Sequence, residues 1–508
     1  MKRKNCIFVA KLFLRIIIHN LISINMKQFI IGRNKEQEEL ENIYSSKQAE
    51  FVVVYGRRRV GKTYLVRELF DDRLTFYHTA LSPFEMEKEN GGLLIQQQLS
   101  VFGESLRTYG DDHGIPPKDW LQAFSWLKSL LSRKSRKKRL VVFLDELPWM
   151  DTPRSGFMTA FEHFWNGWGA GQHNLMLIVC GSASSWINDK LINNTSGLYG
   201  RTTREIHLSP FSLPECKQYF HLHNHKMSDY DILQFYMVMG GIPYYMSYME
   251  KGKSLAQNID NLFFKEKSKL RLEFERLFKS LFVGPQKYID ILHLLSTRRM
   301  GYSRTEITKA LKLNSGGGLT SLLLSLEACD FIKQYIPFGT SQRNIHYKLT
   351  DLFCLFYFYF IDAHKNTSPT FWQDNHRSAS LNAWRGFSFE EVCFSHQESL
   401  KKALGISGVH CEVSVWRNNA PDDHTQIDMV IDRADHSVNL CEMKFYSDEF
   451  EIDKNYSREL NRKINVFMHQ TKTKKTPHLT IVTTYGVKQN AYSGQVDNVI
   501  TLESLFKD

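Results

Sequence analysis

The segment with the clearest chemical pattern has the form G-x-x-x-x-G-K-T and reads Gly56-Arg57-Arg58-Arg59-Val60-Gly61-Lys62-Thr63. It comes directly after the apolar run 51–55 and before the helical stretch 64–70, which begins at Tyr64. In such a strand–loop–helix context, backbone N–H groups and the helix N-terminus surround phosphates. We predict that residues 56–64 bind a nucleotide, that Lys62 reaches the β- and γ-phosphates, and that Thr63 ligates Mg²⁺.

Two carboxylates, Asp145 and Glu146, end a second apolar run at residues 140–144. A carboxylate at the end of a buried strand is placed to hold Mg²⁺, directly or through water, and a neighbouring one can polarise the attacking water. We assign the first role to Asp145 and the second to Glu146. The two segments together predict a P-loop ATPase that uses ATP and Mg²⁺.

These residues need a scaffold that brings several strand ends together. From Phe29 to about Leu213, short β-branched runs alternate with helical stretches, a pattern that indicates a parallel sheet wrapped by helices. Residues 175–180 are the third clear strand. We therefore expect an α/β ATPase core over residues 26–212, followed by a helical lid over residues 213–280 that contains the turn Gly240 to Tyr245.

Four stretches resemble the archaeal-type ATPase family of AAA-related P-loop proteins: Phe29 to Arg33, the P-loop, Asp145-Glu146, and Cys180-Gly181-Ser182. The resemblance covers about Phe29 to Tyr245. It implies that Gly32 and Arg33 flank the adenine and that Ser182 senses the γ-phosphate.

The segment Leu198-Tyr199-Gly200-Arg201 is similar to the part of this family that carries a trans-acting arginine. The resemblance implies that Arg201 stabilises charge on a phosphoryl group bound by another subunit, which would require a homo-oligomer. Arg204 is the neighbouring candidate. A solvated surface arginine is the alternative.

Residues 281–365 contain three short helical segments, a hairpin formed by 331–335 and 345–349, and an aromatic helix. Helices followed by a hairpin predict a winged helix-turn-helix. The expected recognition helix, residues 318–328, has no Lys or Arg, so phosphate contacts would have to come from Lys309, Lys312, Lys333, Arg343 and Lys348. The alternative is a packing spacer or a protein-binding unit.

A second group with chemical potential lies in residues 371–508, which we expect to form a separate α/β unit. Asp428 and Glu442 lie on two successive predicted strands, and Lys444 shares a face with Glu442 because side chains alternate along a strand. Two carboxylates suit Mg²⁺ or Mn²⁺, and the amine can position water or stabilise negative charge. This is the chemistry of phosphodiester hydrolysis.

The same residues resemble the PD-(D/E)XK nuclease superfamily. The resemblance implies that Glu390 is the upstream acidic metal ligand, that Asp428 and Glu442 are the other two, and that Glu442 and Lys444 are catalytic. Gln426 corresponds to a polar residue beside the metal-binding acid. The sequence departs from the pattern because no proline precedes Asp428.

The composition is compatible with these assignments. The chain of 508 residues is 42% hydrophobic and has a formal net charge of +11, which favours several globular domains and a polyanionic partner such as DNA. An ordinary basic protein is the alternative. The eight cysteines show no C-x-x-C spacing, which indicates a reducing, cytoplasmic compartment.

No membrane association is expected. The most apolar run, Leu352 to Ile361, is about half as long as a membrane-spanning helix. Residues 1–25 are basic and apolar, but Lys11 and Arg15 interrupt the apolar stretch, so we interpret this segment as an extended or misassigned start.

Three functions follow from these patterns. The first is an ATPase coupled to a DNA-directed module with a metal-dependent nuclease centre. The second is an ATP-dependent regulatory switch whose nuclease-fold domain binds without cutting. The third is an enzyme that acts on protein partners.

Overall fold

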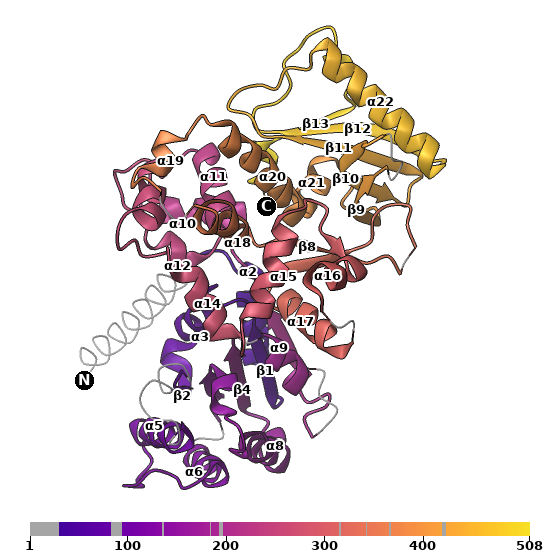
Figure 1. The fold of residues 1–508 in the computed structure, drawn as a ribbon. Coiled ribbons are helices and arrows are strands. Elements are labelled where there is room, and N and C mark those ends of the chain that lie inside the picture. The colour runs from indigo at the N-terminus through magenta and orange to yellow at the C-terminus, as the bar shows by residue number, and fades with distance from the viewer. Residues whose placement is uncertain are drawn as a thin grey trace, which may run out of the picture. The chain divides into compact units, whose positions relative to one another are not determined.

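The computed structural model describes residues 30–82, 94–134, 137–182, 184–192, 197–313, 316–341, 343–364, 367–418 and 423–507. The predicted start segment, residues 1–25, lies outside these ranges. The chain divides into two compact units, Met1–Ser209 and Pro210–Asp508 (Figure 1). They are called unit 1 and unit 2 below.

Unit 1 is built on a five-stranded parallel sheet in the order β2-β3-β4-β1-β5. Its strands are β1 (Glu50–Tyr55), β2 (Leu74–Thr79), β3 (Leu140–Asp145), β4 (Leu175–Gly181) and β5 (Arg204–His207). Every residue of β3 and β4 is buried, because helices cover both faces of a parallel sheet. The three apolar runs thus form β1, β3 and β4, and the predicted α/β fold with a parallel sheet is confirmed.

The larger helices of unit 1 are α2 (Asn34–Ser45), α3 (Lys62–Phe70), α5 (Leu94–Thr108), α6 (Trp120–Ser132) and α8 (Phe157–Gly167). Aromatic side chains join α6 and α8 to the sheet: the Phe161 ring lies 5.7 Å from those of Phe51 and Phe124. Short helical segments are η1 (Asp71–Arg73), α7 (Leu147–Met150), η2 (Gly169–Gly171), α9 (Ser184–Ile187) and η3 (Asn188–Ile192).

Unit 2 begins with helices, as predicted for residues 213–280: α10 (Leu213–Leu222), α11 (Asp229–Met239), α12 (Pro243–Met246), α13 (Leu255–Ile259), η4 (Asp260–Phe264) and α14 (Glu273–Leu281). The turn before α12 needs a glycine. At Gly241 φ is +68°, and a Cβ would lie 2.2 Å from the carbonyl oxygen of Phe211.

The aromatic run of unit 2 forms α18 (Leu352–Phe356) and η5 (Tyr357–Asp362), which pack against the preceding helices. The ring of Phe356 lies 4.7 Å from that of Phe263, and Phe353 lies 5.0 Å from Tyr245. Within the described ranges, no helix combines the length and the apolar character that a membrane crossing needs.

Between these helices lie α15 (Gln286–Ser296), β6 (Tyr302–Ser303), α16 (Arg304–Leu311), α17 (Gly317–Ala328), β7 (Ile332–Tyr335) and β8 (His346–Leu349). The strands form an antiparallel sheet in the order β6-β8-β7. The three helices and the hairpin were expected. The two-residue strand β6 was not, because it is too short to produce a sequence pattern.

The rest of unit 2 contains a five-stranded sheet in the order β13-β12-β11-β10-β9. Its strands are β9 (Cys411–Arg417), β10 (Gln426–Arg433), β11 (Ser437–Lys444), β12 (Thr476–Thr483) and β13 (Asn498–Thr501). The strands β9, β10 and β11 pair antiparallel, whereas β11, β12 and β13 pair parallel.

The connections in this part are helical: α19 (Phe371–Asp374), α20 (Ala379–Ser395), α21 (Gln397–Ala403), α22 (Lys454–Thr471), η6 (Ser493–Gln495) and α23 (Leu502–Leu505). The crossover from β11 to its parallel neighbour β12 requires a long connection, and α22 supplies it. The helix α22 therefore belongs to the connection that leaves β11, the strand that carries Glu442 and Lys444, and returns to β12.

Candidate functional site

The strand order of unit 1 places three predicted segments at one edge of the sheet. The strand β4 lies between β1 and β3, and all three run parallel, so their carboxyl ends meet. The P-loop leaves β1, Asp145 ends β3, and Ser182 follows β4. Ligands of open parallel sheets bind at this edge.

The glycines of the P-loop are required by its backbone. At Gly56 φ is +138°, and a Cβ would lie 2.3 Å from the carbonyl oxygen of Leu208. Gly61 has φ +96° and precedes α3, whose first residue is Lys62. Only glycine adopts such conformations readily, so the loop can present backbone N–H groups and a helix N-terminus to phosphates.

Lys62, Thr63 and Asp145 converge at the start of α3. The Lys62 Nζ donates to the carbonyl oxygens of Gly56 at 2.9 Å and Arg57 at 3.0 Å. The Thr63 hydroxyl donates to Asp145 Oδ2 at 3.0 Å. A hydroxyl and a buried carboxylate are hard oxygen ligands, so the two side chains fit the Mg²⁺ role predicted for them.

Glu146 faces the end of β4. Its Oε2 accepts hydrogen bonds from the Ser182 amide at 3.1 Å and the Ser182 hydroxyl at 3.0 Å. Burial raises the pKa of Glu146 above its ordinary value, and the nearby charge of Lys62 opposes this shift. The structure thus pairs the predicted base with the predicted γ-phosphate sensor.

Sequence reasoning missed two further contacts of Asp145. The Cys180 thiol donates to Asp145 Oδ1 at 2.6 Å, and the Thr79 hydroxyl donates to Oδ2 at 3.4 Å. Burial raises the pKa of Cys180 well above its usual range, so this thiol is a neutral donor. These two donors reach Asp145 because β3 lies between β2 and β4 in the sheet. The sequence of a single strand does not reveal which strands are its neighbours.

The remaining predicted residues of unit 1 occupy different surroundings. Arg33, with φ +56°, is buried and donates through Nη2 to the Ser209 carbonyl at 2.5 Å and to the Val60 carbonyl at 3.4 Å. The neighbouring Gly32 has φ +59°. Tyr64 and Arg201 are exposed, and the contact between Arg201 and another subunit stays a prediction.

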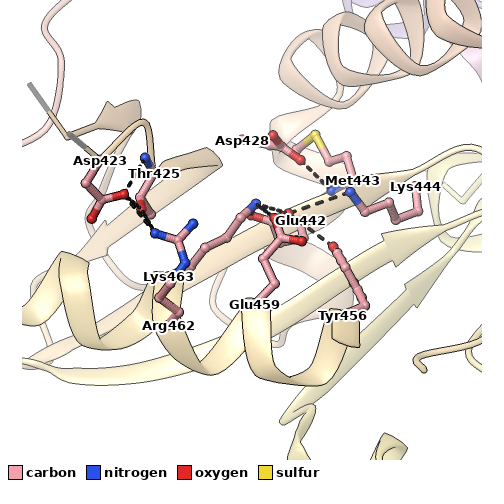
Figure 2. Close-up of polar contacts among 10 residues, drawn as sticks. All are labelled: Asp423, Thr425, Asp428, Glu442, Met443, Lys444, Tyr456, Glu459, Arg462 and Lys463. Carbon is pink, nitrogen blue, oxygen red and sulfur yellow. Dashed lines mark hydrogen bonds and ion pairs between the residues drawn. The ribbon is translucent and has the colours of Figure 1, made fainter. Parts of the chain in front are cut away.

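The second predicted group meets in unit 2, on the adjacent strands β10 and β11 (Figure 2). Asp428 Oδ2 accepts the backbone N–H of Met443 at 3.0 Å. Lys444 Nζ lies 3.7 Å from Glu442 Oε2. The strands therefore bring Asp428, Glu442 and Lys444 to one place, as the alternation of side chains predicted.

Two residues of α22 complete this group and were not predicted. Lys463 Nζ donates to both carboxylate oxygens of Glu442, at 2.8 and 2.7 Å, and the Tyr456 hydroxyl donates to Oε2 at 3.2 Å (Figure 2). Lys463 is thus closer to Glu442 than Lys444 is. A basic residue on an amphipathic helix gives no sequence signal that it faces inward.

Glu390 on α20 is the third predicted carboxylate, and it pairs with Arg299 Nη1 at 2.7 Å. Burial and the charge of Asp428 raise the pKa of Glu390 to about 8. The same two causes raise the pKa of Glu442 to about 7. The negative charge of Asp428 therefore acts on both glutamates. We call Glu390, Asp428 and Glu442 the acidic centre.

The acidic centre does not fit a metal ion in this arrangement. Within the described residues, no group of three or more His, Cys, Asp or Glu side chains is placed to hold one. Arg299 and Lys463 each pair with one glutamate, and the Met443 amide occupies an oxygen of Asp428. The predicted Mg²⁺ or Mn²⁺ site at these residues is therefore not formed, because protein cations and a backbone donor take its place.

One predicted phosphate contact is wrong. Lys348 is buried and pairs with Glu391 at 2.6 Å, so its amine is not available to DNA. The pair joins β8 to α20. The alternation of side chains along the hairpin strands does not show which face of the hairpin α20 covers. The other cations proposed for this role, Lys309, Lys312, Lys333 and Arg343, are exposed.

The raised pKa values predict how stability depends on pH. Between about pH 4.5 and about pH 8, the folded chain holds protons on Glu390 and Glu442 that the unfolded chain has released. Stability should therefore fall as pH rises through this window. Thermal melting at several pH values should show a falling melting temperature, with a shallower slope in Glu390→Gln. Glu451→Gln, an exposed glutamate, is the control, and equal slopes in all three proteins would contradict the prediction.

Residues 30–249 match a family model described as an ATPase domain predominantly from archaea. An uncharacterised protein of Methanocaldococcus jannaschii is 25% identical over 443 residues, which cover 85% of this chain and 91% of that protein. An uncharacterised ATP-binding protein of the same organism is 37% identical over 43 residues, or 8% of this chain and 73% of that protein.

Two solved structures are also similar. A Walker-type ATPase of Pyrococcus abyssi has 21% identity and a TM-score of 0.44, over 65% of this chain and 96% of that one. The ORC2 protein of Aeropyrum pernix, in ADPNP and ADP complexes, has 15% identity and a TM-score of 0.36, over 68% of this chain and 95% of that one. The family match and the P-loop site agree: residues 30–249 are similar to an archaeal-type ATPase domain.

Proposed function

We propose that this chain is an ATP-driven, DNA-directed protein, in which ATP hydrolysis in unit 1 controls a winged helix and a nuclease-like domain in unit 2. The observation that carries the proposal is the meeting of Asp428, Glu442 and Lys444 on β10 and β11, in a chain that also has a complete P-loop site. An acid pair with an amine is the residue set that the sequence assigned to phosphodiester hydrolysis, and in this arrangement Arg299 and Lys463 hold its two glutamates.

For ATP hydrolysis, the residue roles follow from the geometry at the edge of the first sheet. Lys62 would bind the β- and γ-phosphates, while Thr63 and Asp145 would hold Mg²⁺, which supplies charge neutralisation when it is bound. Glu146 would orient and polarise the attacking water. Its hydrogen bonds to Ser182 support a role for Ser182 in positioning this carboxylate.

Three further roles complete the proposed site. Gly32 and Arg33 would flank the adenine, as the resemblance to the archaeal-type ATPase family implies, and Arg33 also contacts the carbonyl of Val60 in the P-loop. Arg201 would act on ATP bound by another copy of the chain, and its exposure supports that role. Residues 57–59 would form the curve of the loop around the phosphates.

The proposed winged helix consists of α15, α16, α17 and the sheet β6-β8-β7. Its support is the order of three helices followed by a hairpin. Since α17 carries no Lys or Arg, the contacts would be made to phosphates by the four exposed cations Lys309, Lys312, Lys333 and Arg343. Such contacts bind DNA without reading its sequence.

A specific observation favours the second candidate, a regulatory switch with a non-catalytic nuclease-fold domain. Arg299 and Lys463 pair with Glu390 and Glu442, and permanent pairs would keep a metal ion out of the acidic centre. The two candidates differ in whether the acidic centre ever binds a metal ion and cuts.

The DNA-directed proposal predicts salt-dependent binding. Four phosphate contacts correspond to a loss of affinity of about 100-fold between about 50 and about 200 mM salt. Fluorescence anisotropy with a labelled duplex measures this loss. Replacing Lys309 and Lys312 together by Ala should reduce the slope by about half, whereas Lys47→Ala in unit 1 should leave it unchanged. Failure to bind DNA or RNA at low salt would favour the third function, action on protein partners.

The proposed nuclease activity is tested with the same purified proteins. Wild type and Glu442→Ala are incubated with single-stranded, duplex and branched DNA, with Mg²⁺ or Mn²⁺, with and without ATP, while phosphate release is followed. Cutting by the wild type that Glu442→Ala abolishes would support the proposal. DNA binding without cutting under every condition would favour the regulatory switch.

A further inference from the structure

The helix α22 has a polar side along its whole length. A row of exposed residues at intervals of three or four runs along it and ends just after it: Lys454, Arg458, Arg462, Asn465, His469 and Lys472. Because an α-helix has about 3.6 residues per turn, such intervals place all these side chains on one side of the helix. We call these residues the basic face of α22.

The opposite side of α22 is buried, and the helix lies along the second sheet of unit 2 (Figure 1). Leu460 and Phe467 belong to two buried apolar clusters, which also contain Leu440 of β11 and Ile481 of β12. Lys463 lies on the same side and binds the acidic centre. The helix is therefore held at several points, and the basic face stands on a fixed support.

Most cations of the basic face have no acidic partner. Within the described ranges, Arg462 pairs with Asp423 at 2.8 Å, and 52% of its side chain remains exposed. In the same ranges, Lys454, Arg458 and Lys472 form no ion pair. Their charges extend over about 27 Å, because a helix rises about 1.5 Å per residue.

This spacing of charges does not stabilise α22 by itself. Arg458 lies four residues from both Lys454 and Arg462, and like charges at that spacing destabilise an isolated helix. The single acid of α22, Glu459, lies 3.9 Å from Lys463, whose amine faces the acidic centre. A polyanion bound along the basic face would relieve the repulsion between its cations.

The C-terminal end of α22 adjoins the loop between β7 and β8. The Phe338 ring of this loop lies 5.1 Å from the Phe467 ring of α22. A Cβ on Gly339 would lie 4.0 Å from Cγ2 of Thr471. Arg343 belongs to the same loop and is exposed. The basic face thus ends beside a loop that carries one of the proposed DNA contacts.

The chemistry of the basic face favours a nucleic-acid duplex over two other polyanionic partners. Membrane-surface helices insert an apolar face, but the apolar side of α22 is buried, and this fully described helix exposes no large apolar side chain. Single-stranded nucleic acids stack their bases on aromatic side chains, and the basic face has none. What it offers is a row of cations, which suits the regularly spaced phosphates of a duplex.

We propose that the basic face of α22 binds the phosphate backbone of duplex DNA, with Lys454, Arg458 and Lys472 each contacting a phosphate. The inference rests on the proposed DNA-directed function, and it adds a second contact surface to the cations of the winged helix. The contacts are electrostatic and read no base sequence. The other side of the same helix contacts the acidic centre through Tyr456 and Lys463.

The test is fluorescence anisotropy of the full-length chain with a labelled DNA duplex at a series of salt concentrations. Three added phosphate contacts should make the loss of affinity between about 50 and about 200 mM salt about 40-fold larger than the roughly 100-fold loss expected for four contacts. A triple variant, Lys454→Gln with Arg458→Gln and Lys472→Gln, should lose this additional salt dependence.

A matched control removes the same charge elsewhere in unit 2. It combines Lys251→Gln, Lys265→Gln and Lys267→Gln, three exposed lysines of the first helical part. It should leave the salt dependence unchanged, because net charge alone does not make a phosphate contact. Asn465→Lys adds a cation to the basic face and should increase the loss of affinity about 3-fold over the same salt range. Structural damage cannot produce such a gain.

Every outcome decides the inference. If the wild type binds the duplex but the triple variant keeps its salt dependence, or the matched control loses as much, the inference is wrong and the proposed DNA-directed function stands. If the wild type binds no nucleic acid at low salt, both are wrong. Binding to phosphatidylserine vesicles that only the triple variant loses, with duplex binding unchanged, would identify a membrane surface and overturn the inference. Tighter binding of a single strand than of the duplex, lost in the triple variant, would overturn the assignment to a duplex.

Discussion

Replacement of Glu146 by Gln should lower the rate of ATP hydrolysis by about 10²- to 10⁴-fold while ATP binding persists, because an amide cannot accept a proton from the attacking water. Gln keeps the shape of the side chain and can still contact Ser182. The P-loop residues are untouched, so affinity for a fluorescent ATP analogue should stay within a few-fold of the wild type. Phosphate release and analogue binding measure the two quantities.

Lys62→Ala gives the complementary result, since it removes the amine that we propose binds the phosphates. Both binding and turnover should fall. Lys47→Ala, an exposed lysine of the same unit, is the control and should behave as the wild type. Turnover in Glu146→Gln that equals the wild-type rate would exclude Glu146 as the base, and retained binding in Lys62→Ala would contradict the assignment of the loop.

The ATPase site could be predicted from the sequence because each of its parts is local. Gly56 follows the apolar residues 51–55 of β1, and Asp145 ends β3 after the apolar residues 140–144, so the position of the functional residue is fixed by the end of the strand. Parallel strands have their carboxyl ends at one edge. The strand order was not predictable, and it alone brings Cys180 and Thr79 to Asp145.

The acidic centre shows where local patterns are insufficient. Alternation along β11 correctly put Glu442 and Lys444 together, but the closest cation is Lys463, which comes from a helix. Arg299 is farther from Glu390 in the sequence than Lys463 is from Glu442, and it lies in a turn without any periodic pattern. Such partners depend on how separate elements pack, which composition and spacing do not encode.

The error at Lys348 has the same cause and leads to the second large expected effect. Lys348→Met should destabilise unit 2 by about 3–5 kcal/mol, because it leaves the Glu391 carboxylate buried without its cation. Only 8% of the lysine side chain and 1% of the glutamate side chain are exposed, so water cannot replace the lost partner. Burial already raises the pKa of Glu391, and the nearby charge of Lys348 opposes that shift.

The measurement is thermal or urea unfolding of the full chain, with the transition of unit 2 assigned by the fluorescence of its own tryptophans, such as Trp384. The control is Lys333→Met, because Lys333 lies directly opposite Lys348 on β7 and is exposed. Its effect should be within about 0.5 kcal/mol. Lys348→Met combined with Glu391→Gln should recover much of the loss, since a neutral amide costs less to bury than a carboxylate. If Lys348→Met is as stable as Lys333→Met, the buried pair does not hold β8 to α20.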